Sequence, residues 1–239
     1  LTPKHIDMIA IAAMRGTTPA IETLATIAKS RPELLKQNHV DALATATATA
    51  AEKEAELAVE ALSTIAESRP ELIRQSHVNA LAIAIRRGVA PAMQALATIA
   101  KTRPELVRPD HVDLLAKAAE RKMEQAAQAL ATIARSRLEL LKPSHIDALA
   151  EAARKGVEPA VQALEEIARK TPELIKPSHI DALAEAAMEG VQEAVKALIV
   201  MASTKPELLK TKHVDALAEA AMEGVEPAAQ VLEKIAWRA

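Results

Sequence analysis

A histidine returns at nearly constant intervals along the whole chain. The seven histidines are His5, His39, His77, His111, His145, His179 and His213. Their spacings are 34, 38, 34, 34, 34 and 34 residues. A fixed period of this size is typical of stacked supersecondary units, each of which buries its apolar face against its neighbours. We therefore expect a repeat array, with a four-residue insertion in the second repeat near "TATATAAEKEAE".

The residue types favour helices over strands. Half of the residues are hydrophobic, yet the chain has no Phe, no Tyr and a single Trp, Trp237. Ala, Leu, Ile and Glu predominate, and the aromatic residues that stabilise strands are almost missing. The composition therefore predicts an all-α fold.

The fifth repeat shows how one unit is built. Ser144 stands before His145 and Asp147 follows it, an arrangement similar to a capping box, so Ser144 is expected to be the N-cap of a first helix. Gly156 is expected to end this helix, because glycine adopts the left-handed conformation of a C-cap. The predicted apolar stripe consists of Ile146, Leu149, Ala150 and Ala153.

A second helix follows in the same repeat. Pro159 suits its first turn, and the segment 171–175 predicts a short connector to the next repeat. The predicted stripe of the second helix consists of Ala160, Ala163, Leu164, Ile167 and Ala168. Neither helix can bury its stripe alone, so the hairpins are expected to stack.

The sequence thus predicts a single domain, residues 1–239, that is an α-solenoid of seven helical hairpins with a right-handed superhelix. The expected repeats are 1–34, 35–72, 73–106, 107–140, 141–174, 175–208 and 209–239.

One run of residues resembles a known class of helical repeat. Residues 95–100 read "ALATIA" and residues 104–109 read "PELVRP", which is similar to HEAT and armadillo repeats. The regularity of the repeats also resembles engineered helical repeat proteins. Both resemblances imply an α-solenoid that binds a protein or peptide.

The first repeat also resembles TAL-effector repeats, which have the same period and bind DNA. Its opening, "LTPKHIDMIA", and Ala20-Ile21-Glu22-Thr23 carry the likeness. TAL-effector repeats read bases with a variable residue pair after the first helix. The corresponding pairs here are mostly alanines, such as Ala152-Ala153, which cannot hydrogen-bond to base edges. A nucleic-acid-binding array therefore remains the alternative.

The charge and the cysteine content limit which partners and which cellular compartment are expected. The formal net charge is −2, so no overall basic field attracts nucleic acid or an anionic membrane. There is no cysteine for a disulfide or a thiolate, which fits the cytoplasm or expression in a bacterial host. No apolar run approaches the length of about 18 residues expected of a membrane span.

Each histidine is followed two residues later by Asp or Asn, and this column is the first candidate for chemistry. Equivalent positions are expected on the order of 10 Å apart by helix packing, whereas metal–nitrogen distances are about 2 Å. One metal ion could not be shared along the column. We therefore expect the histidines to be structural, covering the previous connector, and we expect no metal, no cofactor and no enzymatic activity.

The tips between the two helices of each repeat carry charge. They are basic in the early repeats and acidic in the sixth and seventh, where Glu189 and Glu223 stand. A basic edge could attract an acidic partner or a phosphate backbone. Its predicted residues are Arg15, Arg86, Arg87, Arg121, Lys122, Arg154 and Lys155.

Two columns change character along the chain. On the first helix, Ile11, Thr45 and Ile83 give way to Lys117 and three glutamates. On the second helix, threonine gives way to Glu166. The early repeats are thus expected to present an apolar-to-neutral strip for a helix or extended peptide. The predicted partner surface comprises Ile11, Thr26, Thr64, Ile83, Thr98 and Thr132.

These features predict a non-enzymatic binding scaffold, natural or designed, whose partner is a protein or peptide. Self-association is a further possibility, and residues 197–202, "ALIVMA", are a candidate patch for it. A designed scaffold with a small-molecule pocket is a weaker alternative, and the insertion of the second repeat is where such a pocket would be sought.

Overall fold

The computed structural model describes residues 2–121 and 123–236. Within these residues the chain is all-α: α-helices alternate with short 3-10 turns, and no strand is present. The helices divide into two compact units, residues 1–114 and 115–239, whose boundary falls inside α7. This confirms the predicted all-α helical repeat.

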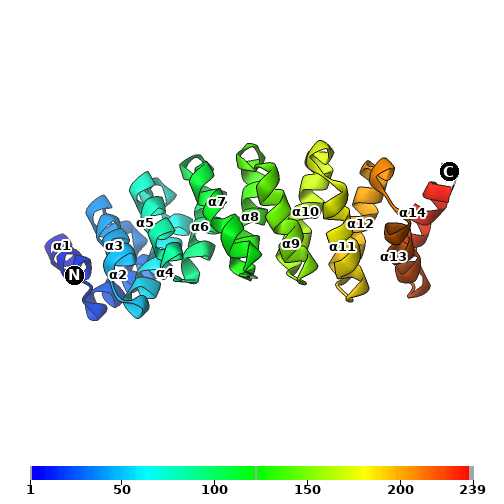
Figure 1. Ribbon diagram of the computed structural model, residues 1–239. Coiled ribbons are helices and arrows are strands. Elements are labelled where there is room, and N and C mark those ends of the chain that lie inside the picture. The colour runs from blue at the N-terminus through cyan, green and yellow to red at the C-terminus, as the bar shows by residue number, and fades with distance from the viewer. Residues whose placement is uncertain (1, 122, 237–239) are drawn as a thin grey trace. The chain divides into compact units, whose positions relative to one another are not determined.

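Unit 1 contains three hairpins and the start of a fourth. Helices α1, α3 and α5 pack against one another in one layer, and α2, α4 and α6 pack in a second layer. Figure 1 shows these hairpins following one another side by side. The elements are α1 (Pro3–Met14), α2 (Thr18–Ser30), η1 (Pro32–Leu34), α3 (Gln37–Thr49), α4 (Glu52–Ser68), η2 (Pro70–Leu72), α5 (Gln75–Arg86), α6 (Pro91–Thr102), η3 (Pro104–Leu106) and α7 (Pro109–Glu120).

Unit 2 repeats the same arrangement. Helices α9, α11 and α13 form one layer, and α8, α10, α12 and α14 form the other. The elements are α8 (Glu124–Ser136), η4 (Leu138–Leu140), α9 (Pro143–Arg154), α10 (Glu158–Lys170), η5 (Pro172–Leu174), α11 (Pro177–Met188), α12 (Gln192–Thr204), η6 (Pro206–Leu208), α13 (Thr211–Met222) and α14 (Glu226–Ala236).

The predicted apolar stripes are the core of the hairpins. All nine stripe residues of the fifth repeat are buried, and none is more than 5% exposed. Alanine supplies more than half of the nine, which lets neighbouring helices approach closely. The hydrophobic burial of each hairpin therefore comes from many small contacts rather than from aromatic side chains.

Glycine ends the first helix of a repeat as predicted. Gly156 has φ +79°, and the backbone N–H groups of Gly156 and Val157 donate to Ala153 O and Ala152 O. This is the left-handed C-cap expected after an α-helix. The second and fourth repeats lack this glycine, and there the end of the helix is capped in another way, as described below.

The prediction of the N-cap was wrong. The N-cap of α9 is Lys142, two residues before the predicted Ser144, and Pro143 and Ser144 already lie in the first turn. His145 occupies the third helical position, and its Nδ1 accepts the N–H of Lys142 at 3.0 Å. The imidazole thus accepts the N-cap backbone N–H, as the glutamate side chain does in an ordinary capping box. Asp147 takes no part in this cap.

The four-residue insertion lengthens α4 at its start. α4 has 17 residues, whereas α2 and α10 have 13 each. The added turn brings Glu54 to Thr18 at the start of α2, where the hydroxyl donates to Glu54 Oε1 at 2.7 Å. The insertion thus lies at the helix end that the sequence indicated.

Candidate binding surface

Successive repeats are joined by contacts between a buried histidine and an aspartate. His39, His77, His179 and His213 are each fully buried, and each Nε2 lies 2.6–2.8 Å from the carboxylate of the preceding repeat. We call these contacts the His–Asp ladder. Its pairs are His39–Asp7, His77–Asp41, His179–Asp147 and His213–Asp181.

The hydrogen bond that caps the helix determines which ring nitrogen of each ladder histidine carries the proton. In repeat three, Nδ1 of His77 accepts the backbone N–H of Arg74 at 3.1 Å, so the neutral ring carries its proton on Nε2. That N–H donates to Asp41. One imidazole therefore closes the start of its own helix and binds the carboxylate of the repeat before it.

Burial and hydrogen bonding set the charge of the ladder. Burial lowers the pKa of His77 and His179, and the hydrogen bonds to Asp41 and Asp147 offset this only in part. Burial alone would raise the pKa of Asp41, but hydrogen bonds from His77 and Gln37 outweigh it, so the carboxyl pKa lies below its ordinary value. In the His77–Asp41 and His179–Asp147 pairs, the favoured state is therefore a neutral imidazole that donates to a carboxylate.

The sequence showed the His-x-Asp column but not what the aspartate contacts. We expected the histidine to cover the previous connector, whereas its partner is the aspartate of the previous repeat. Among the described residues, no group of three or more His, Cys, Asp or Glu could hold a metal ion. The ladder is a structural element that joins repeats.

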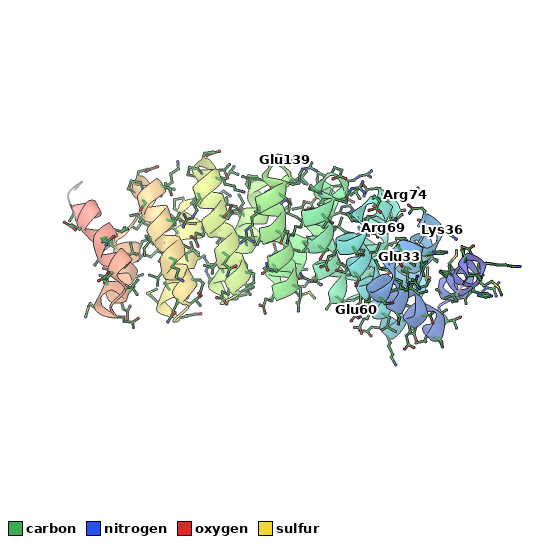
Figure 2. The ribbon with its side chains drawn as sticks, turned by 180° about the vertical axis from the view of Figure 1, so that it is seen from behind. Glu33, Lys36, Glu60, Arg69, Arg74 and Glu139 are labelled. Carbon is green, nitrogen blue, oxygen red and sulfur yellow. The ribbon has the colours of Figure 1, made fainter. Side chains whose placement is uncertain are left out.

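The connectors add a second link between repeats. Arg103 donates through one guanidinium nitrogen to Pro70 O at 2.7 Å, and Arg69 donates to Pro32 O at 3.2 Å. Both arginines also pair with the glutamate two residues later. Figure 2 shows Arg69 and Arg74 gathered with Glu33 and Lys36 along one edge of unit 1. Arg69 and Arg103 therefore hold each connector against the one before it.

Part of the predicted basic edge caps neighbouring helices. Arg87 donates to the last carbonyls of α3, at Thr47, Ala48 and Ala50, where the second repeat has no glycine. Lys155 donates to Glu120 O at the end of α7, in the fourth repeat, which also lacks the glycine. A cation at a helix C-terminus stabilises the exposed carbonyls.

The rest of the predicted edge is divided. Arg154 pairs with Glu151 and with Glu185 of the next repeat, each at 2.7 Å. Arg15, Arg86 and Arg121 are exposed at the helix ends, and Lys122 lies outside the described residues. The basic edge is thus in part an inter-repeat structure rather than a continuous free surface.

The first-helix residues of the predicted partner surface are exposed in unit 1. Ile11 on α1 is 55% exposed and Ile83 on α5 is 41% exposed, and Thr45 lies at the equivalent position of α3 between them. We call these three residues the isoleucine row. A groove of about 550 Å³ runs between α3 and α5, and its lining includes Thr45 and Ile83.

The threonines of the prediction lie on the second helices. Thr26 on α2 is exposed, and Thr64 and Thr132 are half-buried. Thr98 is only 9% exposed and accepts a hydrogen bond from Ser63, because it lies where α4 and α6 pack. The structure thus does not bring all six predicted residues onto one exposed strip.

Unit 2 carries charge where unit 1 carries isoleucine. Glu151 and Glu185 occupy the column of Ile11 and Ile83, and Arg154 bridges the two carboxylates. Exposed charge pairs of this kind keep a helix layer hydrated. The apolar character of this column is therefore a feature of unit 1.

Comparison with known proteins assigns no family. No protein-family model matches the chain, and no curated protein matches it. An engineered protein known from its crystal structure is 18% identical, with a TM-score of 0.35 over 97% of this chain and 96% of that one. A Sel1 repeat protein from Oxalobacter formigenes is 19% identical, with a TM-score of 0.32 over 97% of this chain and 80% of that one.

None of the described helices is long and apolar enough to cross a membrane.

Proposed function

We propose that the chain is a non-enzymatic binding scaffold, and that unit 1 binds a peptide segment along the isoleucine row. The observation that carries this proposal is the exposure of two large aliphatic side chains at equivalent positions, one of which, Ile83, lines a groove. Leaving Ile11 and Ile83 in water costs free energy that a docked apolar side chain recovers.

The groove between α3 and α5 offers polar groups beside its apolar ones. Asp41 and Arg74 line it together with Thr45 and Ile83. A peptide that places an apolar side chain on Ile83 can also hydrogen-bond to these charged groups, which would fix its orientation. We therefore expect the partner to be an amphipathic peptide, not a wholly apolar one.

Panning a random peptide library tests this function. Wild-type protein is the target, and an Ile11→Glu/Ile83→Glu variant is the counter-target. Glutamate already occupies this column at Glu151, so the variant is expected to fold. Met222→Glu, which alters a side chain 89% exposed in unit 2, is the matched control.

The expected result is a set of peptides that bind wild type and Met222→Glu but bind the double variant at least about tenfold more weakly. The proposal fails if no peptide is enriched, or if the enriched peptides bind the double variant equally well.

A nucleic-acid array receives less support from the site. Arg87, Arg154 and Lys155 already have partners within the protein, so fewer cations are free for phosphates. Fluorescence polarisation with a labelled duplex at low salt separates the two functions. Binding that disappears as salt rises would favour nucleic acid, because phosphate contacts release counterions.

A further inference from the structure

His111 on α7 differs from the ladder histidines because its outer ring nitrogen has no acceptor. Its side chain is 1% exposed, and among the residues that the structure describes its Nε2 has no hydrogen-bond partner. Nδ1 accepts the N–H of Arg108 at 3.1 Å, so the neutral ring carries its proton on Nε2. Leaving a buried donor unpaired costs free energy, which a ligand that supplies an acceptor recovers.

The preceding repeat supplies no carboxylate to this nitrogen. In the ladder pairs, an aspartate of the preceding repeat places its oxygen 2.6–2.8 Å from the histidine Nε2. Asn79 stands at this position before His111, and its Oδ1 accepts from Gln75 at 3.2 Å. The ladder thus shows that a carboxylate fits beside a histidine in this architecture, and the contact between α5 and α7 lacks one.

The place beside the histidine Nε2 is open to solvent in the ladder pairs. The side chains of Asp41 and Asp147 are 50% and 48% exposed, although their histidines are buried. Next to His111, Asn79 is exposed, and the Asp110 side chain is 65% exposed with its carboxylate 3.8 Å from Nε2. Exposed side chains change rotamer within nanoseconds, so a ligand oxygen can enter between these two.

The charges around His111 favour an anion. Arg108 stands directly before α7 and Arg86 near the end of α5, and both are exposed. In the described part of the chain, neither guanidinium has a salt bridge or a hydrogen bond. Burial lowers the pKa of His111, Asp110 opposes this, and Arg108 and Arg86 lower the pKa again, so all three charges act at the ring. Two cations against one carboxylate leave a positive charge that an incoming carboxylate would neutralise.

An equivalent cation in unit 2 shows how Arg108 can take part. Lys176 stands directly before α11, as Arg108 does before α7, and its Nζ lies 3.0 and 2.9 Å from the two oxygens of Asp147. The same carboxylate lies 2.7 Å from His179 Nε2. One carboxylate therefore binds a cation and an imidazole together. Arg108 and His111 hold the same two positions without the carboxylate.

We propose that the partner peptide of unit 1 places an Asp or Glu side chain between α5 and α7, where its carboxylate accepts from His111 Nε2 and pairs with Arg108. This inference rests on the proposed binding of a peptide along the isoleucine row. Asn79 and Ile83 both line the groove between α3 and α5, and they lie about 6 Å apart along the axis of α5. Alternate residues of an extended peptide are about 6.6 Å apart, so an acidic residue at His111 and an apolar residue at Ile83 fit one peptide.

Acetate, a carboxylate without a peptide, tests the site directly. Protein with isotope-labelled histidine is titrated with sodium acetate and followed by NMR, and sodium chloride of equal ionic strength is the control. The His111 ring signal is identified by its loss in His111→Gln. It is expected to shift and to saturate within about 1–100 mM acetate, and to stay in place with chloride.

Two substitutions at equivalent positions are matched opposites. Asn79→Asp gives His111 a carboxylate of its own chain, so the acetate shift of His111 is expected to disappear. Asp41→Asn takes the carboxylate from His77, which is expected to gain an acetate shift that it lacks in wild type. If Asp41→Asn loses its helices by circular dichroism, Asn79→Asp decides, because an added acceptor is expected to stabilise the fold.

Two further substitutions test the charges around the site. Arg108→Gln removes the cation that pairs with the ligand and is expected to weaken acetate binding about three- to tenfold. Asp110→Asn removes the nearby negative charge and is expected to strengthen it. A change in the opposite direction for both variants would contradict binding of an anion.

The peptides enriched on wild-type protein are the second arm of the test. They are expected to contain Asp or Glu and to bind Asn79→Asp at least about tenfold more weakly than wild type. Changing that acidic residue of the peptide to Asn or Gln is expected to abolish this difference between the two proteins.

The outcomes separate this inference from the proposed function. An acetate titration that leaves His111 unmoved, or moves it equally in Asn79→Asp, overturns the carboxylate site. Enriched peptides that bind wild type and Asn79→Asp equally also overturn it, while the proposed function stands. Failure to enrich any peptide overturns the proposed function and with it the peptide as the source of the carboxylate, whatever acetate does.

Discussion

In the repeat before His111, Asn79 occupies the position from which aspartate binds the next histidine in the ladder pairs. It is the one residue at this position, among the repeats that precede a histidine, that has no carboxylate. His111 is 1% exposed, and its Nε2 has no hydrogen-bond partner, whereas Nδ1 still accepts the N–H of Arg108 at 3.1 Å. Asn79 Oδ1 accepts from Gln75 instead. The Asp110 carboxylate lies 3.8 Å from this nitrogen, beyond hydrogen-bond distance. A buried donor without an acceptor costs free energy, so we expect this contact between repeats to be weaker than the ladder pairs.

Asn79→Asp is expected to stabilise the protein by about 1–2 kcal/mol, because it gives His111 Nε2 an ionised acceptor. Urea unfolding followed by circular dichroism measures the change in midpoint. The matched control is Asp41→Asn, which removes the same acceptor from His77 and is expected to lower the midpoint. An unchanged or lower midpoint for Asn79→Asp would show that the missing carboxylate is not what weakens this joint.

The ladder contact between His179 and Asp147 is expected to contribute about 1–3 kcal/mol of coupling energy. A double-mutant cycle with His179→Gln and Asp147→Asn measures it, since each change keeps the size of the side chain close to the original. Lys176 also contacts Asp147, at 2.9 Å, so a parallel cycle with Lys176→Met separates the surface pair from the buried one. The buried pair is expected to carry the larger coupling; a zero value for it would contradict the structural role of the ladder.

Arg87→Ala is expected to destabilise unit 1 by about 1 kcal/mol, because the last carbonyls of α3 lose their cap. Arg86 precedes it in the chain, is exposed and makes no such contact, so Arg86→Ala is the matched control and is expected to change stability by less than about 0.5 kcal/mol. Thermal unfolding of the two variants side by side gives the comparison. Equal losses would mean that general charge, not the cap, is responsible.

The free energy of unfolding is expected to fall as the pH drops below about 6.5. Burial lowers the pKa of His77, His111 and His179 in the folded chain, so the unfolded chain binds more protons in this range. The stability is therefore complete above the ordinary histidine pKa and is lost as the pH falls through the lower folded values.

The carboxylates add to this loss at more acidic pH. The pKa values of Asp41, Asp147 and Asp181 lie below the ordinary 3.8, so their contribution disappears as the pH falls through the folded values. Denaturant unfolding at a series of pH values, with His77→Gln/His179→Gln beside wild type, measures the dependence. The variant is expected to lose part of the slope between about pH 7 and 5. An identical slope would assign the pH dependence to other groups.

The repeat period and the apolar stripes were sufficient to predict the helices, because they reflect local burial that every repeat satisfies in the same way. Ile146 and Leu164 are buried as their spacing predicts. Gly156 ends its helix as predicted, because a left-handed C-cap depends on that residue alone. The N-cap was misplaced by two residues because the capping group is an imidazole reaching back from the third position, and preferences for Ser or Asp do not describe that case.

The contacts between repeats could not be predicted from the sequence. Whether Asp41 caps its own helix or reaches His77 depends on how closely the hairpins stack, which neither residue reveals by itself. The same holds for Arg87. Its place at a helix tip predicts a free cation, but its side chain caps the C-terminal end of α3, where the repeat has no glycine. Thr98 is buried and Thr26 is exposed, although their helices have the same sequence pattern. This difference likewise follows from the packing between helices.

The extra turn at the start of α4 shows which changes of length this architecture tolerates. Four residues come close to one helical turn of about 3.6 residues, so the added turn extends the apolar stripe of α4, and its Ala55 is buried. One or two added residues would not complete a turn, so they could not extend the stripe in this way. Insertions of about one turn at this helix end thus offer a way to extend a single tip for a new contact while every later repeat keeps its register.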